Sequence, residues 1–180
     1  MKVLLINNGN PYDSMRVPCG QWGNRWCVDY LRHHPSKPKG VLWDDAMNWG
    51  RENGLKYMIF LNDRLAVKHN GIKNLFQVAE KHPEYIAIGG SLKHVNEKRD
   101  RMVGGVKKEN EFITHKTESG VFPVDWVGEE FTIHQTQPLI PYSHEDDANF
   151  NNYSWSHDAK SYGHELAVTG DAEAYNRVNV

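Results

Sequence analysis

The sequence predicts an α/β fold in which a mostly parallel central sheet is flanked by helices, and three observations predict it. Residues 57–61 and 85–88 are short, continuous apolar runs, which is typical of strands buried on both faces of a sheet. Between them, apolar residues recur at helical spacing over residues 72–79. A further helix precedes the first run and ends near Gly54. This alternation of helix and strand across residues 41–92 favours parallel strands joined by helical crossovers.

The other elements are predicted from composition and from the turn residues beside them. Residues 41–43 are interpreted either as a short strand or as the lead-in to the helix that residues 48–50 open. The predicted strands are residues 3–6, 57–61, 85–88, 121–127, 131–133 and 166–168. The predicted helices are residues 26–31, 48–53, 70–81 and one that the polar cluster 144–150 opens.

Residues 93–120 depart from this alternation. They are rich in Lys, Arg, Glu and Asn, and they carry Gly104 and Gly105 near the middle. One interpretation is a solvated hairpin or loop, which the interspersed charges of both signs favour. The other is a lid whose cations face a phosphate, and those cations are Lys93, Lys98, Arg99, Arg101, Lys107 and Lys108.

The composition limits the classes of protein to which this chain can belong. The 180 residues are expected to form one domain, 1–180, and the net charge of −2 gives no electrostatic case for nucleic acid or an anionic membrane. No apolar run approaches the ~20 residues that cross a bilayer, and residues 1–10 lack the apolar core of a signal peptide. With only Cys19 and Cys27, no disulfide framework is expected, and a cytoplasmic location is predicted.

Two acidic segments are the strongest candidates for chemistry. Asp63 follows the buried run 57–61, and open α/β sheets bind ligands at the carboxyl ends of their strands. A carboxylate there can hold a hard cation or a ribose hydroxyl, although a turn or helix-cap role is equally well supported. The second segment is residues 144–147, His-Glu-Asp-Asp, whose adjacent carboxylates repel one another unless a cation or a proton joins them. Its simpler interpretation is an acidic helix N-terminus, which the helix dipole favours.

A family resemblance follows from these segments. The stretch NWGRENGLKYMIFLNDR, residues 48–64, is similar to the helix-then-strand segment of family 2 glycosyltransferases with the GT-A fold. In that family an Asn-x-Gly opens the helix, and the strand ends in an acidic triplet, the DXD motif. The segments PVDWVGEEFTI, HEDDANF and YGHELAV resemble the later half of the family, especially its rhamnosyltransferase-like members. The resemblance covers residues 41–175 and implies a compact, GT-A-like glycosyltransferase domain.

Carried over residue by residue, the resemblance implies a site for a nucleotide-diphosphate sugar of the UDP, GDP or dTDP type. Its residues are Asn7, Asn8, Asn48, Asn62, Asp63 and Arg64. Arg64 stands where the family has its acidic metal ligand, and a cation neutralises a diphosphate but does not ligate a metal. Three alternatives stay open: a Mn²⁺ or Mg²⁺ ion held by Asp63, with His164 as a further ligand, an enzyme that needs no metal, or a chain that has lost activity.

The same resemblance implies an acceptor site and a base. Trp126, Gly128 and Glu129 would border the acceptor, which is a glycan or another hydroxyl compound. Asp146 would be the general base, with Glu145 beside it. The implied mechanism is a direct displacement with inversion at the sugar carbon, in which Asp146 takes the proton of the acceptor hydroxyl.

Other function classes are weighed against this one. A non-catalytic nucleotide- or carbohydrate-binding module on the same fold is the alternative that Arg64 keeps open. A nucleotidyltransferase ranks last, because it usually needs a glycine-rich basic loop after its first strand, and residues 6–16 supply one glycine and one arginine. The ten histidines show no HExxH spacing of the kind found in zinc hydrolases.

Overall fold

The computed structural model describes residues 2–7, 27–32, 39–61, 65–67, 69–94, 100–109, 111–142 and 152–176. Its helices are α1 (Lys39–Glu52), α2 (His69–Lys81) and α3 (Asn152–Ser161). Its strands are β1 (Lys2–Asn7), β2 (Cys27–Arg32), β3 (Tyr57–Leu61), β4 (Leu65–Val67), β5 (Tyr85–His94), β6 (Arg101–Lys108), β7 (Glu111–Lys116), β8 (Val121–Val124), β9 (Trp126–Val127), β10 (Phe131–Gln135) and β11 (Glu165–Asn176). None of the described helices combines the length and the hydropathy that a membrane span requires.

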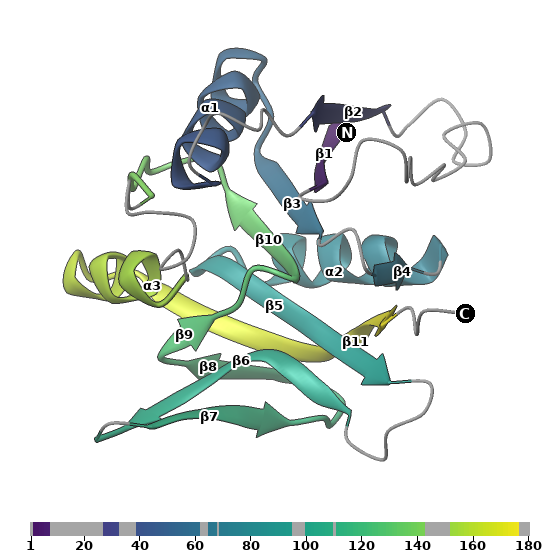
Figure 1. Cartoon of the computed structure of the whole chain (residues 1–180), viewed down its shortest axis with the longest axis vertical. Coiled ribbons are helices and arrows are strands. Elements are labelled where there is room, and N and C mark those ends of the chain that lie inside the picture. Colours follow the sequence, from purple (N-terminus) through teal and green to yellow (C-terminus); the bar gives the residue numbers. More distant parts are fainter. Residues whose placement is uncertain are drawn as a thin grey trace.

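The strands form a mixed, mostly antiparallel sheet (Figure 1). Its path is β3-β10-β5-β11-β4, with β6, β7, β8 and β9 paired beside it, and the β1–β2 pair lies against β3. Of the nine strand pairs among the described residues, only β1–β2 and β5–β11 are parallel. The prediction of a mostly parallel sheet is therefore wrong.

Strand β10 is the physical reason for this difference. The predicted order α1, β3, α2, β5 is present, and β3 and β5 point the same way because each is antiparallel to β10. A helical crossover fixes the relative direction of two strands, but it does not make them neighbours. β10 comes from later in the chain and fills the space between them, with Ile133 opposite both Ile59 and Ile88.

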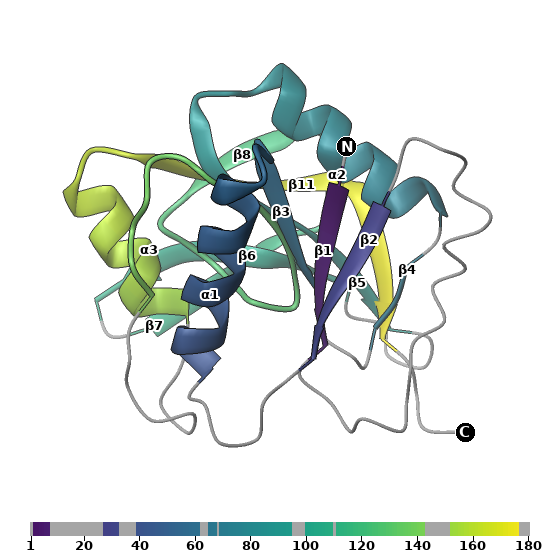
Figure 2. The ribbon, with the colours of Figure 1, turned by 90° about the horizontal axis from the view of Figure 1, so that it is seen from above.

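Helices cover both faces of the sheet, with α2 on one face and α1 and α3 on the other (Figure 2). All five residues of β3 are buried, so its side chains alternate between two hydrophobic cores. Ile59 packs in the core beneath α2. Met58 and Phe60 pack in the other core with Trp43 of α1 and Trp155 of α3. The continuous apolar run that predicted a covered strand is explained by these two cores.

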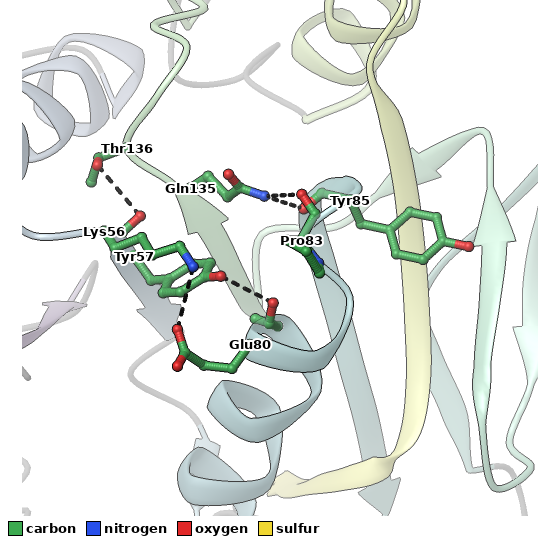
Figure 3. A network of polar contacts seen from close by, with 8 residues as sticks. Lys56, Tyr57, Glu80, Pro83, Tyr85, Gln135 and Thr136 are labelled. Carbon is green, nitrogen blue, oxygen red and sulfur yellow. Dashed lines mark hydrogen bonds and ion pairs between the residues drawn. The ribbon is translucent and has the colours of Figure 1, made fainter.

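Polar contacts fix the amino end of β3 against α2, β5 and β10 (Figure 3). The Tyr57 hydroxyl donates to the carbonyl of Ala79 at 3.0 Å. The Gln135 side-chain amide donates to the carbonyls of Pro83 and Tyr85 at 2.8 and 2.9 Å. These hydrogen bonds connect the start of β3 to the end of α2, and the end of β10 to the α2–β5 connection. They thereby help to position β3, including its carboxyl end.

Helix α1 ends where the sequence predicts and begins earlier. Gly54 has a φ of 68°, and the Leu55 amide donates to the Gly50 carbonyl at 2.8 Å, which is the pattern of a glycine C-cap. Within the described residues α1 begins at Lys39, so the prediction that residues 48–50 open the helix is wrong. Its apolar stripe starts before residue 48, and that stripe, rather than the Asn-x-Gly, determines where the helix runs.

The remaining predictions have mixed outcomes. Residues 27–32 form strand β2, paired in parallel with β1, so the prediction of helical turns at residues 26–31 is wrong. The strand predictions are confirmed, with 121–127 divided into β8 and β9 and with β5 and β11 longer than predicted. Residues 101–116 form the β6–β7 hairpin, which confirms the hairpin interpretation, although residues 102–105 of β6 are buried.

Candidate functional site

Much of the predicted catalytic and donor site lies outside the described residues. The predicted residues concerned are Asn8, Asn62, Asp63, Arg64, Glu145 and Asp146. Asn7 is the last residue of β1, at the end of the strand that the sequence predicts, but its side chain is not described. The roles of these residues stay predictions, and the structure bears on them through the described residues that flank them.

One described flank of each acidic segment lies at the start of β10, and Tyr142, which precedes the second segment, contacts His134 further along that strand. Leu61 ends β3 and is opposite Phe131, the first residue of β10. Glu130 directly precedes Phe131, and it lies near the ring of Tyr153 in the first turn of α3. Burial raises the pKa of the Tyr153 hydroxyl, and the Glu130 charge raises it further. Residues 62–64 follow the first of these flanks in sequence, and residues 145–147 precede the second.

The strand that follows the first acidic segment in sequence, β4, starts beside the carboxyl ends of two further strands. Leu65 of β4 is opposite Asn176 of β11, and Asn176 is opposite His94, the last residue of β5. In the sequence, residues 62–64 connect the end of β3 to the start of β4. The start of β4 lies beside the carboxyl ends of β5 and β11. This agrees with the expectation that ligands bind at the carboxyl ends of strands in an α/β sheet.

The predicted acceptor segment leads from β9 into β10. The Gly128 amide donates to the Val103 carbonyl at 3.1 Å, which holds the segment against β6. A Cβ atom on Gly128 would lie 2.7 Å from a Glu130 carboxylate oxygen, so a larger residue there would displace the Glu130 side chain. That carboxylate forms an ion pair with Arg101. Glu129 is partly buried and directly precedes Glu130, and the acceptor role of Trp126, Gly128 and Glu129 stays a prediction.

A cavity of about 540 Å³ opens beside Trp126, and we name it the aromatic pocket. The rings of Phe112 and Tyr153 stack with centroids 3.9 Å apart and planes 15° apart. Trp126 stands edge-on to both, at interplanar angles of 89° and 79°. Three elements distant in sequence, the β6–β7 hairpin, β9 and α3, therefore contribute one ring each to the same corner.

Sequence reasoning identified Trp126 but missed Phe112 and Tyr153. Phe112 is 42% exposed although it is a large aromatic residue. The available signal was the adjacent apolar pair at 112–113 inside a charged segment, since solvated hairpins rarely need such a pair. Tyr153 gave no signal, because an aromatic residue near a helix start is more often part of the core.

A second cavity of about 520 Å³ lies at the other end of the β6–β7 hairpin and includes Lys93 and Glu173. The Lys93 ammonium lies 2.6 Å from a Glu173 carboxylate oxygen, and this hydrogen bond raises the pKa of the Lys93 amine. Arg101 is paired with Glu130 in the same way. Both described pairs engage cations of the proposed lid with carboxylates, which favours the solvated hairpin over a phosphate-facing lid.

The two predicted residues that remain lie outside the sheet, Asn48 in α1 and His164 between α3 and β11. The Asn48 side-chain oxygen accepts a hydrogen bond from Arg51 at 2.8 Å, within α1. His164 follows α3 and precedes the residue opposite Tyr85, at the amino end of β5. The register therefore places His164 near the amino end of β5, away from the carboxyl end of β3. Asp63 follows that end of β3 by two residues in the sequence. Among the described residues, no group of three or more His, Cys, Asp or Glu side chains is arranged to hold a metal ion.

Two solved structures are similar to this chain. The crystal structure of A197 from STIV matches with a TM-score of 0.61 and 12% identity, over 99% of this chain and 86% of that one. The crystal structure of GalNAc-T7 with UDP, GalNAc and Mn²⁺ matches with a TM-score of 0.60 and 8% identity, over 100% of this chain and 43% of that one. No protein-family model and no curated protein sequence matches the chain.

These likenesses concern the backbone. GalNAc-T7 is a GT-A glycosyltransferase, and this chain spans less than half of its length. At 8% and 12% identity, the similarity carries no information on side-chain chemistry. We conclude that the chain has an α/β fold with a mostly antiparallel mixed sheet, and that its backbone is similar to those of these two structures.

Proposed function

We propose that this protein is a glycosyltransferase that moves a sugar from a nucleotide-diphosphate donor to an acceptor hydroxyl, with inversion at the sugar carbon. One observation carries the proposal: Leu61, which precedes the first acidic segment, and Tyr153, which follows the second, lie at one end of β10, in a fold similar to that of GalNAc-T7. This arrangement supports a shared site for Asp63 and Asp146, whose own positions stay a prediction.

In the proposed mechanism, Asp146 accepts the proton of the acceptor hydroxyl while that oxygen attacks the sugar carbon. The bond from the sugar carbon to the diphosphate breaks at the same time, and the nucleoside diphosphate leaves with its electron pair. Arg64 stabilises the charge that develops on the leaving phosphate. Asp63 is the one predicted donor-site carboxylate at which a divalent ion would add to this stabilisation.

The proposal is tested by calorimetry with UDP, GDP and dTDP, each with and without Mn²⁺. We expect saturable binding of at least one of them, and we expect Arg64→Ala to weaken it by about 10- to 100-fold, because a charge-assisted hydrogen bond is worth about 1.5–3 kcal/mol. Lys73→Ala, on the exposed face of α2, is the matched control and should bind as the wild type does.

The outcomes separate the functions that the fold allows. Binding of none of the three nucleotides, with or without the ion, would contradict the proposal. Nucleotide binding without release of nucleoside diphosphate from the matching sugar nucleotide, in water or with glycan acceptors, would instead indicate a non-catalytic nucleotide-binding module.

A further inference from the structure

The aromatic pocket has the dimensions and lining of a small-molecule site. Its volume of about 540 Å³ falls within the ~300–1,000 Å³ of typical ligand pockets. The stacked pair of Phe112 and Tyr153 and the perpendicular Trp126 give it an apolar corner. Aromatic faces carry partial negative charge and attract the weakly positive C–H groups of an apolar ring face.

The indole N–H of Trp126 is a donor without an acceptor among the described residues. Trp126 is only 4% exposed, and its Nε1 atom is buried. Because this atom has almost no accessible surface, a ligand in the pocket does not reach it. The polar groups that a ligand would meet belong to Asp125, Ser154, His157 and Asp158, which suit a ligand that carries hydroxyl groups as well as an apolar face.

The charges at the pocket compensate one another. The Lys107 amide donates to an Asp125 carboxylate oxygen at 2.9 Å, and the Lys107 ammonium lies 5.7 Å from the centre of the Phe112 ring. The Lys160 ammonium lies 3.9 Å from Asp125 and 3.5 Å from Glu165. With its cations engaged in this way, the pocket offers little excess positive charge to a diphosphate. Its carboxylates can still accept hydrogen bonds from hydroxyl groups.

The location of the pocket fits an acceptor better than a donor. Tyr153 lies between the pocket and the Arg101–Glu130 ion pair, which adjoins the end of β10. Phe112 and Lys107 belong to the β6–β7 hairpin, so the outer wall of the pocket faces away from the end of β3.

We propose that the aromatic pocket binds a neutral pyranose, with the apolar face of the sugar against the aromatic corner and its hydroxyl groups against the polar side chains that line the pocket. Sugar binding itself rests on the pocket alone. The further assignment of the bound pyranose as the terminal sugar of the acceptor rests on the proposed function.

The test is a titration of tryptophan fluorescence and calorimetry with the methyl pyranosides of glucose, galactose, mannose and N-acetylglucosamine. We expect saturable binding of at least one, and we expect Phe112→Ala to weaken it by about 3- to 10-fold, the equivalent of one ring contact. Ile113→Ala is the matched control, because Ile113 is 39% exposed on the same strand and does not line the pocket.

Two results would overturn the proposal: no saturable binding of any of the four pyranosides, or equal weakening by Phe112→Ala and Ile113→Ala. UDP, GDP and dTDP are titrated on the same proteins, and Phe112→Ala should leave nucleotide binding unchanged. If the protein binds a pyranoside in a way that depends on Phe112 but binds no nucleotide, the sugar site is supported and the proposed function is contradicted. Failure of the sugar site and failure of the proposed function are therefore distinguishable.

Discussion

Replacing Asp146 with asparagine is expected to lower sugar transfer by about 10²- to 10⁴-fold, the usual contribution of a positioned general base. The amide of asparagine has nearly the same shape as the carboxylate but cannot take the proton of the attacking hydroxyl. The donor is held by other groups in the proposed site, so nucleotide affinity should stay within about twofold of wild type, a difference of less than ~0.5 kcal/mol. Release of nucleoside diphosphate and calorimetry with the same nucleotide measure the two quantities separately.

The neighbouring carboxylates supply the controls for this substitution. Asp147→Asn changes the same charge one residue further along, and it should lower transfer far less than Asp146→Asn does. Glu145→Gln should lower transfer by an amount between those of the other two substitutions, because Glu145 is predicted to lie beside the general base without itself accepting the proton. Full transfer activity in Asp146→Asn would contradict the assignment of Asp146 as the general base. It would not bear on the proposed nucleotide site, which calorimetry tests separately.

Acidification is expected to destabilise this protein through His134. The imidazole is fully buried and makes two hydrogen bonds, one between Nδ1 and the Tyr142 hydroxyl at 3.0 Å and one between Nε2 and the Thr132 hydroxyl at 3.1 Å. The rings of Trp43, Phe60 and Trp155 lie around it. Burial lowers the pKa of His134 from 6.5 to about 3, because the surroundings do not solvate an imidazolium.

The sign of the effect follows from this depressed pKa. Above about pH 6.5 the imidazole is neutral in both the folded and the unfolded protein, so its contribution does not change with pH. As the pH falls below that value, the unfolded protein binds a proton that the folded protein does not bind until about pH 3. The free energy of unfolding should therefore fall by up to about 1.4 kcal/mol per pH unit, and by ~5 kcal/mol in all.

Urea denaturation of the wild type and of His134→Gln between pH 7 and pH 4 measures this contribution. The variant should be less stable at pH 7, because it loses a ring and a hydrogen bond from the core, by about 1–3 kcal/mol. The difference should shrink as the pH falls, since glutamine has no proton to take up. His157→Gln, whose side chain is 78% exposed, is the control and should follow the wild-type pH dependence. Parallel curves for wild type and His134→Gln would contradict the account.

The elements that sequence patterns predicted well are those whose signal is local. β3 was recognisable because both of its faces are covered, which makes all five of its residues apolar. The end of α1 was recognisable because Gly54 adopts a left-handed conformation that other residues avoid. Strand β2 was mistaken for helix, because a six-residue segment carries too few periods to separate the two patterns.

The parts that the sequence could not predict depend on contacts between distant segments. The directions of the strands in the sheet depend on β10, which lies between β3 and β5, two strands that come well before it in the chain. The aromatic pocket needs Phe112, Trp126 and Tyr153 from three separate elements, and only their packing reveals it. The acceptor segment was found because its Trp and Gly stand close together in sequence.

The central claim is that Asp63 and Asp146 face one cleft at the end of β10. A crystal structure of the protein with the nucleoside diphosphate that binds in calorimetry tests it most directly. The account predicts that the diphosphate lies beside Asp63 and Arg64, with the Asp146 carboxylate on the other side of the same cavity. Finding these two segments on opposite faces of the molecule, with the nucleotide away from both, would contradict it.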